Sequence, residues 1–368
     1  MNVKSITALI EAEAPLSLQE SYDNAGLLVG NPAMEVNAVL ITIDVTEEVV
    51  DEAIAKNCNL IIAHHPLIFG GLKKLTGQND VQRSVIKALK HDIAIYAAHT
   101  NIDNVLQGVS GKMADKLGLI NRQVLVSKPN MLLKLITFVP QLHAYRVREA
   151  IFEAGAGQIG NYDACSFNVN GTGTFRANAA AQPFVGKPGE LHSEDEVRVE
   201  VILPVYQKNA VLAALKKSHP YEEPAYDIIA LENEWANTGA GIVGELAEPE
   251  DESAFLQRIK SVFGTTVIRH TRLLNRKISK VALCGGSGSS LLKNAIAAGA
   301  DIYISGDFKY HEFFEAENRI IIADIGHFES EQFKKDNFYL LITKFMPYPI
   351  FAILTVLSND KMINIPEN

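Results

Sequence analysis

The sequence repeats a pattern across a long interval, and this repeat limits the folds available to the chain. Residues 39–65 align with residues 281–307, and both segments read as an apolar strand, a helix and a second apolar strand. Ala53-Ile54-Ala55 recurs as Ala295-Ile296-Ala297, and residues 99–103 align in the same way with residues 327–331. The repeat predicts two similar α/β halves that pack with pseudo-symmetry. Chance similarity between two βαβ units is the competing explanation.

Strands alternate with helices in the first half. Apolar runs predict strands at 38–44, 59–65 and 93–99, and helical spacing predicts helices at 46–57 and 80–92. The first of these helices begins with Thr46 as a cap and with acidic residues in its first turn. This order indicates a parallel or mixed sheet that carries helices.

The middle of the chain has a different pattern. Strands are expected at 134–140, 197–204 and 227–233, with helices at 144–155 and 207–219, and a Gly/Asn-rich hairpin segment at 157–178. This order is close to a ferredoxin-like α+β unit that interrupts the repeat. We therefore expect an α/β protein with a first half at 1–128, an inserted domain at 129–245 and a second half at 246–368.

Composition limits the partners and the compartment. The net charge is −9, so we expect no broad surface for DNA or RNA, whereas a small nucleotide remains compatible with it. The three cysteines lie far apart, which suits a reducing compartment. The N-terminus does not resemble a signal peptide, and no apolar run is long enough to span a membrane. These features predict a cytoplasmic protein.

Two adjacent histidines follow the second strand. His64 and His65 end an apolar run and precede Pro66. Ligands collect at the carboxyl ends of strands in α/β sheets, whereas adjacent strand residues point to opposite faces. Two neighbouring imidazoles at a broken strand end can therefore reach two neighbouring ions more easily than one.

The aligned segments 99–103 and 327–331 each supply an imidazole and a carboxylate. His99 and Asp103 follow the third strand, and His327 and Glu331 share a face if a helix begins there. Imidazole and carboxylate ligands suit Zn, Fe, Mn, Co or Ni. We predict a site for two divalent ions, with Glu331 as the bridging ligand; the expected ligands are His64, His65, Asp103, His327 and Glu331.

Two further segments are candidates for supporting roles. Asp307 and His311 lie near the position that corresponds to His64 and His65, where they would orient a metal-bound water or act as acid and base; an N-cap and a surface histidine are the alternative. Residues 284–290 form a Gly-rich turn whose amides would bind an anion. A plain tight turn is the alternative there, because the P-loop lysine is missing.

Several motifs taken together resemble a known family. SYDNAGLLVG, IIAHHPLIF, AAHTNIDN, GDFKYHE and DIGHFESE, in this order, are similar to motifs of the GTP cyclohydrolase 1 type 2 homologs, also called Nif-three-like proteins. This resemblance covers residues 1–125 and 250–368. The central AIFEAGAGQIGNYDACSF and SHPYEEPAYD resemble the PII- or CutA-like insert of longer bacterial members.

The resemblance implies a dinuclear metal site whose ligand positions fall on the same five residues. It also implies a toroidal homohexamer whose sites face an internal cavity. The family name implies GTP cyclohydrolase chemistry, although a fold and a metal site transfer between relatives more readily than a substrate does.

Two functions are therefore expected. The first is a metal-dependent hydrolase that opens the purine ring of GTP or cleaves a phosphate ester, with His99 or His311 relaying protons. The second is a non-enzymatic metal-binding scaffold or regulatory protein.

Overall fold

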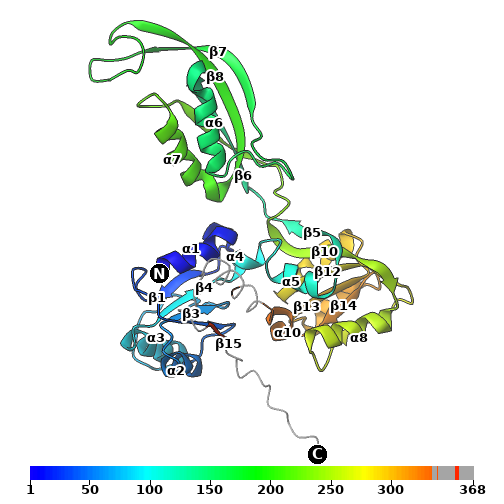
Figure 1. Ribbon diagram of the computed structural model, residues 1–368. Helices are drawn as coiled ribbons and strands as arrows, with labels where there is room; N and C mark the ends of the chain where they lie inside the picture. The colour runs from blue at the N-terminus through cyan, green and yellow to red at the C-terminus, as the bar shows by residue number, and fades with distance from the viewer. Residues whose placement is uncertain (334–337, 339–352, 356–368) are drawn as a thin grey trace, which may run out of the picture. The chain divides into compact units, whose positions relative to one another are not determined.

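The computed structural model describes residues 1–333, 338 and 353–355 and confirms the α/β class (Figure 1). Contacts divide the chain into a larger unit, Met1–Ser127 with Asn237–Asn368, and a smaller unit, Lys128–Ala236. The end of the predicted second half, at 334–337, 339–352 and 356–368, lies outside the described residues. Each unit has its own core.

The first sheet of the larger unit has the strand order β1-β4-β3-β2-β15. Its strands are β1 (Gly26–Val29), β2 (Val39–Thr42), β3 (Leu60–Ala63), β4 (Ala94–Ala97) and β15 (Ile353–Thr355). Strands β2, β3, β4 and β15 run parallel, and β1 pairs antiparallel with β4. The central strands are apolar along their length because both faces of this sheet are buried.

Helices cover both faces of the first sheet. α1 (Val3–Glu13) packs on the face that includes Ile41 and Ile62, whereas α2 (Glu47–Ala55) and α3 (Asp80–Lys90) pack on the opposite face. As predicted, the Thr46 side chain caps α2 by accepting a hydrogen bond from the Val49 amide. The shorter elements near this sheet are η1 (Leu16–Leu18) and α4 (Thr100–Asp103), whereas α5 (Val109–Lys116) follows α4 and packs on the second sheet.

The second sheet has the strand order β11-β14-β13-β12-β10-β5. Its strands are β5 (Ile120–Ser127), β10 (Gly239–Glu250), β11 (Arg269–His270), β12 (Ile278–Ser287), β13 (Ile302–Gly306) and β14 (Ile321–Asp324). α5 and α8 (Glu252–Phe263) pack on one face, and α9 (Leu292–Ala297) and η5 (Tyr310–Ala316) pack on the other. The remaining elements here are η4 (Ser289–Leu291) and α10 (His327–Glu331).

The register of the two sheets confirms the predicted pseudo-symmetry. Val39 pairs with Leu60 in the first sheet, and Val281 pairs with Ile302 at the corresponding position in the second. Strands β2, β3 and β4 therefore correspond to β12, β13 and β14. The connection from β14 to His327 is one residue longer than the connection from β4 to His99, and Gly326 occupies it with φ 94°.

The element boundaries differ from the sequence prediction in two places. Residues 120–127, which the sequence placed in the first half, form β5 and pair with β10 in the second sheet. Residues 239–245, which the sequence placed in the insert, belong to β10. Both are antiparallel strands, and hydrophobic alternation shows that a strand exists but not which sheet it joins.

The smaller unit is one antiparallel sheet with two helices. Its strand order is β7-β8-β6-β9, formed by β6 (Leu132–Pro140), β7 (Phe167–Arg176), β8 (Leu191–Pro204) and β9 (Tyr226–Leu231). α6 (Ala144–Glu153) and α7 (Lys208–Ser218) pack on one face, after the short turns η2 (Gln141–His143) and η3 (Val205–Gln207). The elements follow one another as βαββαβ.

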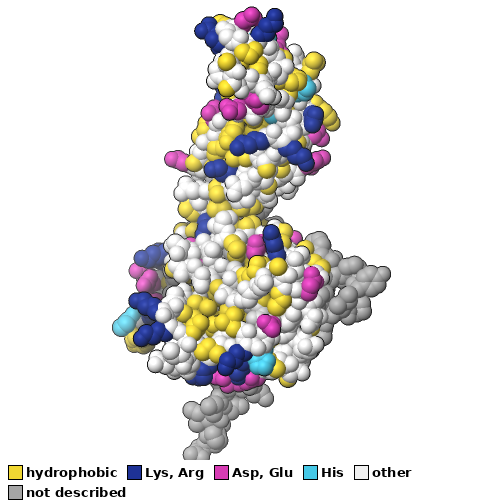
Figure 2. All heavy atoms as spheres, turned by 90° about the vertical axis from the view of Figure 1, so that its left-hand side faces the viewer, with side chains coloured by type: hydrophobic (Ala, Val, Ile, Leu, Met, Phe, Trp, Pro, Cys, Tyr) yellow, Lys and Arg dark blue, Asp and Glu magenta, His cyan; other side chains and the backbone are white. Residues whose placement is uncertain are grey.

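No helix in the described part of the chain is long and apolar enough to cross a membrane. On the face drawn in Figure 2, Lys and Arg side chains are interspersed with Asp and Glu side chains.

Candidate metal centre

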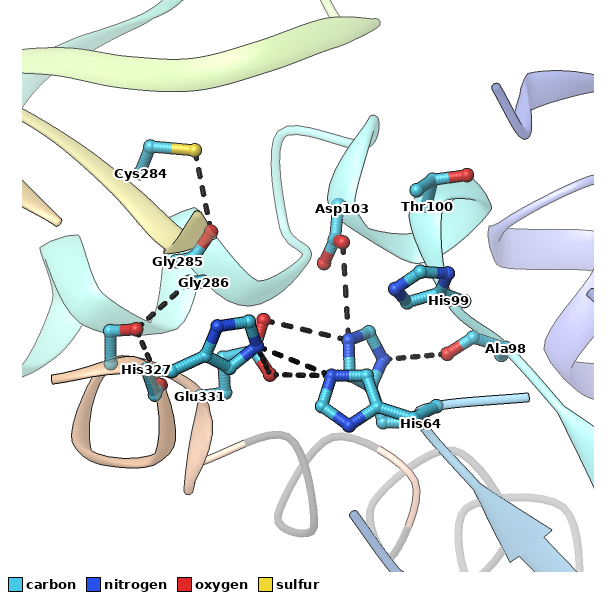
Figure 3. Close-up of polar contacts among 12 residues, drawn as sticks. His64, Ala98, His99, Thr100, Asp103, Cys284, Gly285, Gly286, His327 and Glu331 are labelled. Carbon is cyan, nitrogen blue, oxygen red and sulfur yellow. Dashed lines mark hydrogen bonds and ion pairs between the residues drawn. The ribbon is translucent and has the colours of Figure 1, made fainter. Parts of the chain in front are cut away.

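The carboxyl ends of strands from both sheets bring polar side chains to one place. His64 and His65 follow β3, Asp103 lies at the end of α4 after β4, and His327 and Glu331 lie on α10 after β14. Figure 3 shows the side chains of His64, Asp103, His327 and Glu331 directed toward one another, and His65 Nε2 lies 3.1 Å from Glu331 Oε2. All five residues that the sequence singled out as ligands therefore lie in one cluster, which both pseudo-symmetric halves form together.

The two adjacent histidines diverge because β3 ends at Ala63. The His64 amide bonds to the carbonyls of Thr42 and Ile43, and the ring is fully buried. The His65 ring lies 4.7 Å from the His64 ring at an angle of 50° and is partly exposed. The broken strand end thus gives each ring a separate direction.

Asp103 is positioned by a short helix that side chains hold in place. The Asn101 side-chain amide donates to the Ala14 carbonyl at 2.7 Å, and the Asn104 side-chain amide donates to the Leu18 carbonyl at 2.9 Å. Both asparagines are buried, as is Ile102 between them. The motif HTNIDN therefore combines anchoring residues with residues that face the cluster.

Glu331 lies against the Gly-rich turn after β12. Its side chain is 3% exposed, and an added Cβ at Gly286 would lie 2.4 Å from its Oε1 atom. The Gly286 amide donates to Ser330 Oγ, and the Gly285 amide donates to Ser110 Oγ. Because these amides already have partners within the protein, the structure favours the tight-turn alternative for residues 284–290 over anion binding.

Each histidine of the cluster, and also the bordering His99, has an acceptor on its Nδ1 atom. The partner of His64 is the Ala98 carbonyl at 2.8 Å, and the partner of His65 is Asp44 at 2.7 Å. His99 donates to Asp23 at 2.8 Å, and His327 donates to Asp307 at 2.6 Å. Because these oxygens only accept, each Nδ1 carries a proton and the Nε2 atoms serve the cluster. This arrangement is typical of metal-binding histidines.

Imidazole nitrogens and carboxylate oxygens form three overlapping groups that could hold metal ions. One group is His65, His327 and Glu331, the second is His64, Asp103 and Glu331, and the third is His64, His65 and His99. Within each group one ligand atom of every residue lies within 4.8 Å of the others. The first two groups share Glu331, whose Oε2 lies 3.1 Å from His65 Nε2 and whose Oε1 lies 3.6 Å from His64 Nε2.

The carboxylates of the cluster stabilise positive charge on the neighbouring imidazoles. Burial alone would lower the pKa of His65, but its hydrogen bonds with Asp44 and Glu331 raise the pKa to about 9. The hydrogen bond with Glu331 outweighs burial at His327 and, with Asp307, raises the pKa of that ring to about 9. Protons thus supply, in the metal-free protein, part of the positive charge that bound cations would bring.

The residues present fit divalent transition metals. Ligand atoms bonded to one ion at about 2.0–2.2 Å in tetrahedral geometry lie roughly 3.3 Å apart. In the cluster, the separations from Glu331 oxygens to His64, His65 and His327 Nε2 are 3.6, 3.1 and 3.3 Å. The donors are imidazoles and carboxylates, which suit Zn, Fe, Mn, Co or Ni.

Of the two predicted proton-relay residues, only His99 lies beside the cluster. The His99 ring lies 4.9 Å from the His64 ring and 5.4 Å from the His65 ring, so it borders the cluster. His311 lies exposed on η5, where its ring contacts are with Tyr310 and Phe314. Asp307 lies beside His327 and accepts a hydrogen bond from its Nδ1 atom, a contact that the sequence analysis did not predict.

The sequence analysis did not predict two carboxylates, Asp23 and Asp44, that orient histidines of the site. Asp23 accepts from His99 Nδ1, the Thr100 amide and the Thr100 hydroxyl, and although burial opposes it, these bonds hold its pKa far below the usual range. Burial likewise opposes ionisation of Asp44, but the hydrogen bond with His65 lowers the pKa of Asp44. Asp44 follows a buried strand, and that position at a strand end was the available signal.

Comparison with known proteins reveals similarity over nearly the whole chain. Residues 1–359 match the family described as Duf34/NIF3 (NGG1p interacting factor 3). A protein of Halalkalibacterium halodurans named GTP cyclohydrolase 1 type 2 homolog is 43% identical over 89% of this chain and 88% of its own length. A Bacillus subtilis protein of the same name is 36% identical over 99% and 95%. The crystal structure of a Bacillus cereus protein related to NIF3 superposes with a TM-score of 0.84 at 37% identity, covering 98% of both chains.

Proposed function

The chain belongs to the Duf34/NIF3 family, as its motifs indicated, and we propose that it is a dinuclear metal-dependent hydrolase of nucleotides or phosphate esters. One observation carries this proposal. Two groups of ligand-type side chains, His65 with His327 and His64 with Asp103, share the carboxylate of Glu331. A carboxylate shared by two ligand groups can bridge two neighbouring ions.

Two divalent ions in these groups would act as Lewis acids and would lower the pKa of a bound water to near neutrality. The protein's own residues do the rest. Asp44, Asp307 and the Ala98 carbonyl hold the ring orientation of three histidines through Nδ1. Buried Glu331 holds its two oxygens toward different imidazoles, and the absence of a side chain at Gly286 leaves the space that its carboxylate occupies.

We assign proton transfer to His99. The ionised Asp23 carboxylate accepts from its Nδ1, which leaves Nε2 to exchange protons beside the cluster. The ring is partly exposed, so a substrate can reach it. A histidine oriented by a buried carboxylate is a common general base or acid. His311 has no described contact with the cluster, so this proposal gives it no part.

The class of substrate rests on the family. Relatives carry the name GTP cyclohydrolase 1 type 2 homolog, and this name supports ring opening of GTP as the first reaction to test. Cleavage of a phosphate ester is the second, because a pair of ions can clamp both oxygens of an in-line displacement. We also propose the toroidal homohexamer that the family resemblance implies and the cytoplasmic location that the composition predicts.

The test is turnover by the metal-loaded protein on GTP, other nucleotides and simple phosphodiesters. Glu331→Ala is compared with Glu329→Ala, which removes a carboxylate from the same helix outside the three ligand groups. We expect product from the wild type and from Glu329→Ala but not from Glu331→Ala. Full metal loading without turnover on any substrate would contradict the hydrolase and support the scaffold function instead.

A further inference from the structure

We propose that the smaller unit holds a second ligand site, specific for a planar nitrogen heterocycle with an N–H edge, such as a purine base. A cavity of ≈ 680 Å³ lies within this unit, and that volume is typical of small-molecule sites. All of its lining residues fall between 138 and 225. The proposal is independent of the metal centre, because the two share no residue.

The cavity occupies the sheet face that the helices leave uncovered. Val197, Val199 and Val201 of β8 pack under α6 and α7, so the alternate residues Glu196 and Arg198 point to the opposite face. Figure 1 shows both helices on one side of the long β7–β8 hairpin. The segment after β7, including residues 177–184, contributes to the wall of the cavity on the uncovered side.

Glycines open the floor of the cavity. Gly171 and Gly173 lie in the middle of β7 opposite Glu196 and Glu194, where glycine weakens a strand unless another group must approach closely. An added Cβ at Gly173 would lie 2.2 Å from Glu196 Oε2, so the carboxylate occupies that space. An added Cβ at Gly171 would meet nothing within 4 Å. The space above Gly171 is therefore available to a ligand.

Aromatic rings form the walls. The Tyr221 ring lies 5.9 Å from Phe175 and 6.4 Å from Phe184, and Phe138 lines the same cavity. These rings are inclined to one another by 50–61°, so they border a space and do not stack together. A flat heterocycle can stack on such a ring, as nucleic-acid bases stack on aromatic side chains.

A carboxylate at the floor supplies the polar recognition. Glu196 Oε1 accepts a hydrogen bond from the Tyr221 hydroxyl at 2.9 Å, and its remaining lone pairs can accept from a ligand N–H edge. Burial and the neighbouring Glu196 raise the pKa of Tyr221, so its hydroxyl remains a donor at every physiological pH. The lining contains both signs of charge, with Arg176 and Arg198 against three glutamates, which disfavours a simple cation or anion as the ligand.

A buried histidine fixes this wall of the site. His219 is 7% exposed; its Nε2 donates to the Phe138 carbonyl at 3.0 Å, and its Nδ1 accepts from the Tyr221 amide at 3.1 Å. Burial lowers the pKa of His219, so the ring stays neutral and keeps this tautomer. The motif SHPYEEPAYD, to which the metal centre gives no role, thus positions Tyr221 over the cavity.

Calorimetric titration of the full chain with four probes tests the proposal. Guanosine and adenosine carry N–H edges, caffeine is a planar purine without one, and benzylamine is an aromatic cation. We expect the two nucleosides to bind and caffeine to bind at least tenfold more weakly. Glu196→Gln should weaken nucleoside binding by roughly tenfold or more, because a hydrogen bond to a charged acceptor is replaced by a neutral one. Glu194→Gln, on the same face of β8 but outside the cavity, should not.

Two further variants locate the site. Gly171→Val fills the open space with a residue that suits a strand, and it should abolish binding while circular dichroism shows an intact fold. Glu331→Ala should bind the nucleosides as the wild type does, which separates this site from the metal centre. The proposal is overturned if caffeine or benzylamine binds as well as guanosine, if no probe binds, or if binding survives Gly171→Val but fails in Glu331→Ala.

Discussion

His65 Nε2 and His327 Nε2 lie 3.4 Å apart, although 262 residues separate them in the sequence. Each ring donates its Nδ1 proton to an aspartate of its own half, Asp44 or Asp307. Two imidazole nitrogens at this distance repel each other unless a proton or a cation lies between them. The contact places the candidate metal centre at the junction of the two pseudo-symmetric halves, so neither half forms this cluster alone.

The orienting aspartates should control metal affinity. Asp44→Asn and Asp307→Asn each keep the shape of the side chain but remove the charge that fixes an imidazole. We expect metal affinity to fall by about 10–100-fold in either variant, as for other residues that orient metal ligands. Competition with a chelating dye measures the metal affinity. The control variant is Asp51→Asn, which changes an exposed aspartate of α2 that pairs with Lys87 of α3. Unchanged affinity in both variants would show that the aspartates only stabilise the fold.

His99 should affect turnover more than metal content. Its replacement by glutamine removes a proton-transfer group, which we expect to lower kcat by about 10²–10⁴-fold. Elemental analysis should still find the wild-type metal content in His99→Gln, because the other two ligand groups remain complete. If the variant loses metal together with activity, His99 acts as a ligand through the third group and not as a relay.

Gly286 should be required for the position of Glu331. Its φ is 68°, and a Cβ there would meet Glu331 Oε1, whereas Gly264 has φ 63° and open space around it. Gly286→Ala and Gly264→Ala should each lower the free energy of unfolding of metal-free protein by about 1–2 kcal/mol from backbone strain. Only Gly286→Ala should also lose metal. Equal metal content in the two variants would contradict a role for Gly286 at the site.

Metal binding and stability should depend on pH in opposite directions. The pKa values of His65 and His327 are about 9 in the folded, metal-free protein, against 6.5 for the unfolded chain. Their protonation therefore stabilises metal-free protein fully below pH 6.5, and this stabilisation is lost as the pH rises through 9. Metal must displace these protons, so its affinity should increase from pH 6 to pH 9. Denaturant unfolding and metal titrations across this range measure both trends, and an affinity that falls with pH would refute the assignment.

The sequence was sufficient for the repeat and for the residues that cluster as candidate ligands, because both are local patterns at strand ends. Val39 and Val281, and the histidines and carboxylates that follow the strands, are visible one segment at a time. The contacts that orient the histidines were harder to predict from the sequence. Asp23 and His99 lie 76 residues apart, and no local pattern in either segment indicates that they meet. The sheet to which β5 belongs was hidden for the same reason.

Two predictions, for His311 and for residues 284–290, depended on the directions in which side chains and amides point, and a sequence pattern does not give these directions. His311 lies four residues from Asp307, but η5 is a 3-10 helix on which the exposed histidine ring lies beside Tyr310 and Phe314. The glycines of residues 284–290 resembled an anion-binding turn, whereas their role became clear only with Glu331 and Val109 packed against them.

The most direct test of the two-ion centre is the metal content of protein purified without chelator, measured with that of Glu331→Ala and Glu329→Ala. We predict two tightly held transition-metal ions per chain in the wild type and in Glu329→Ala, and loss of both in Glu331→Ala because that carboxylate completes both groups. One ion per chain in the wild type, or none after reconstitution, would contradict the dinuclear site.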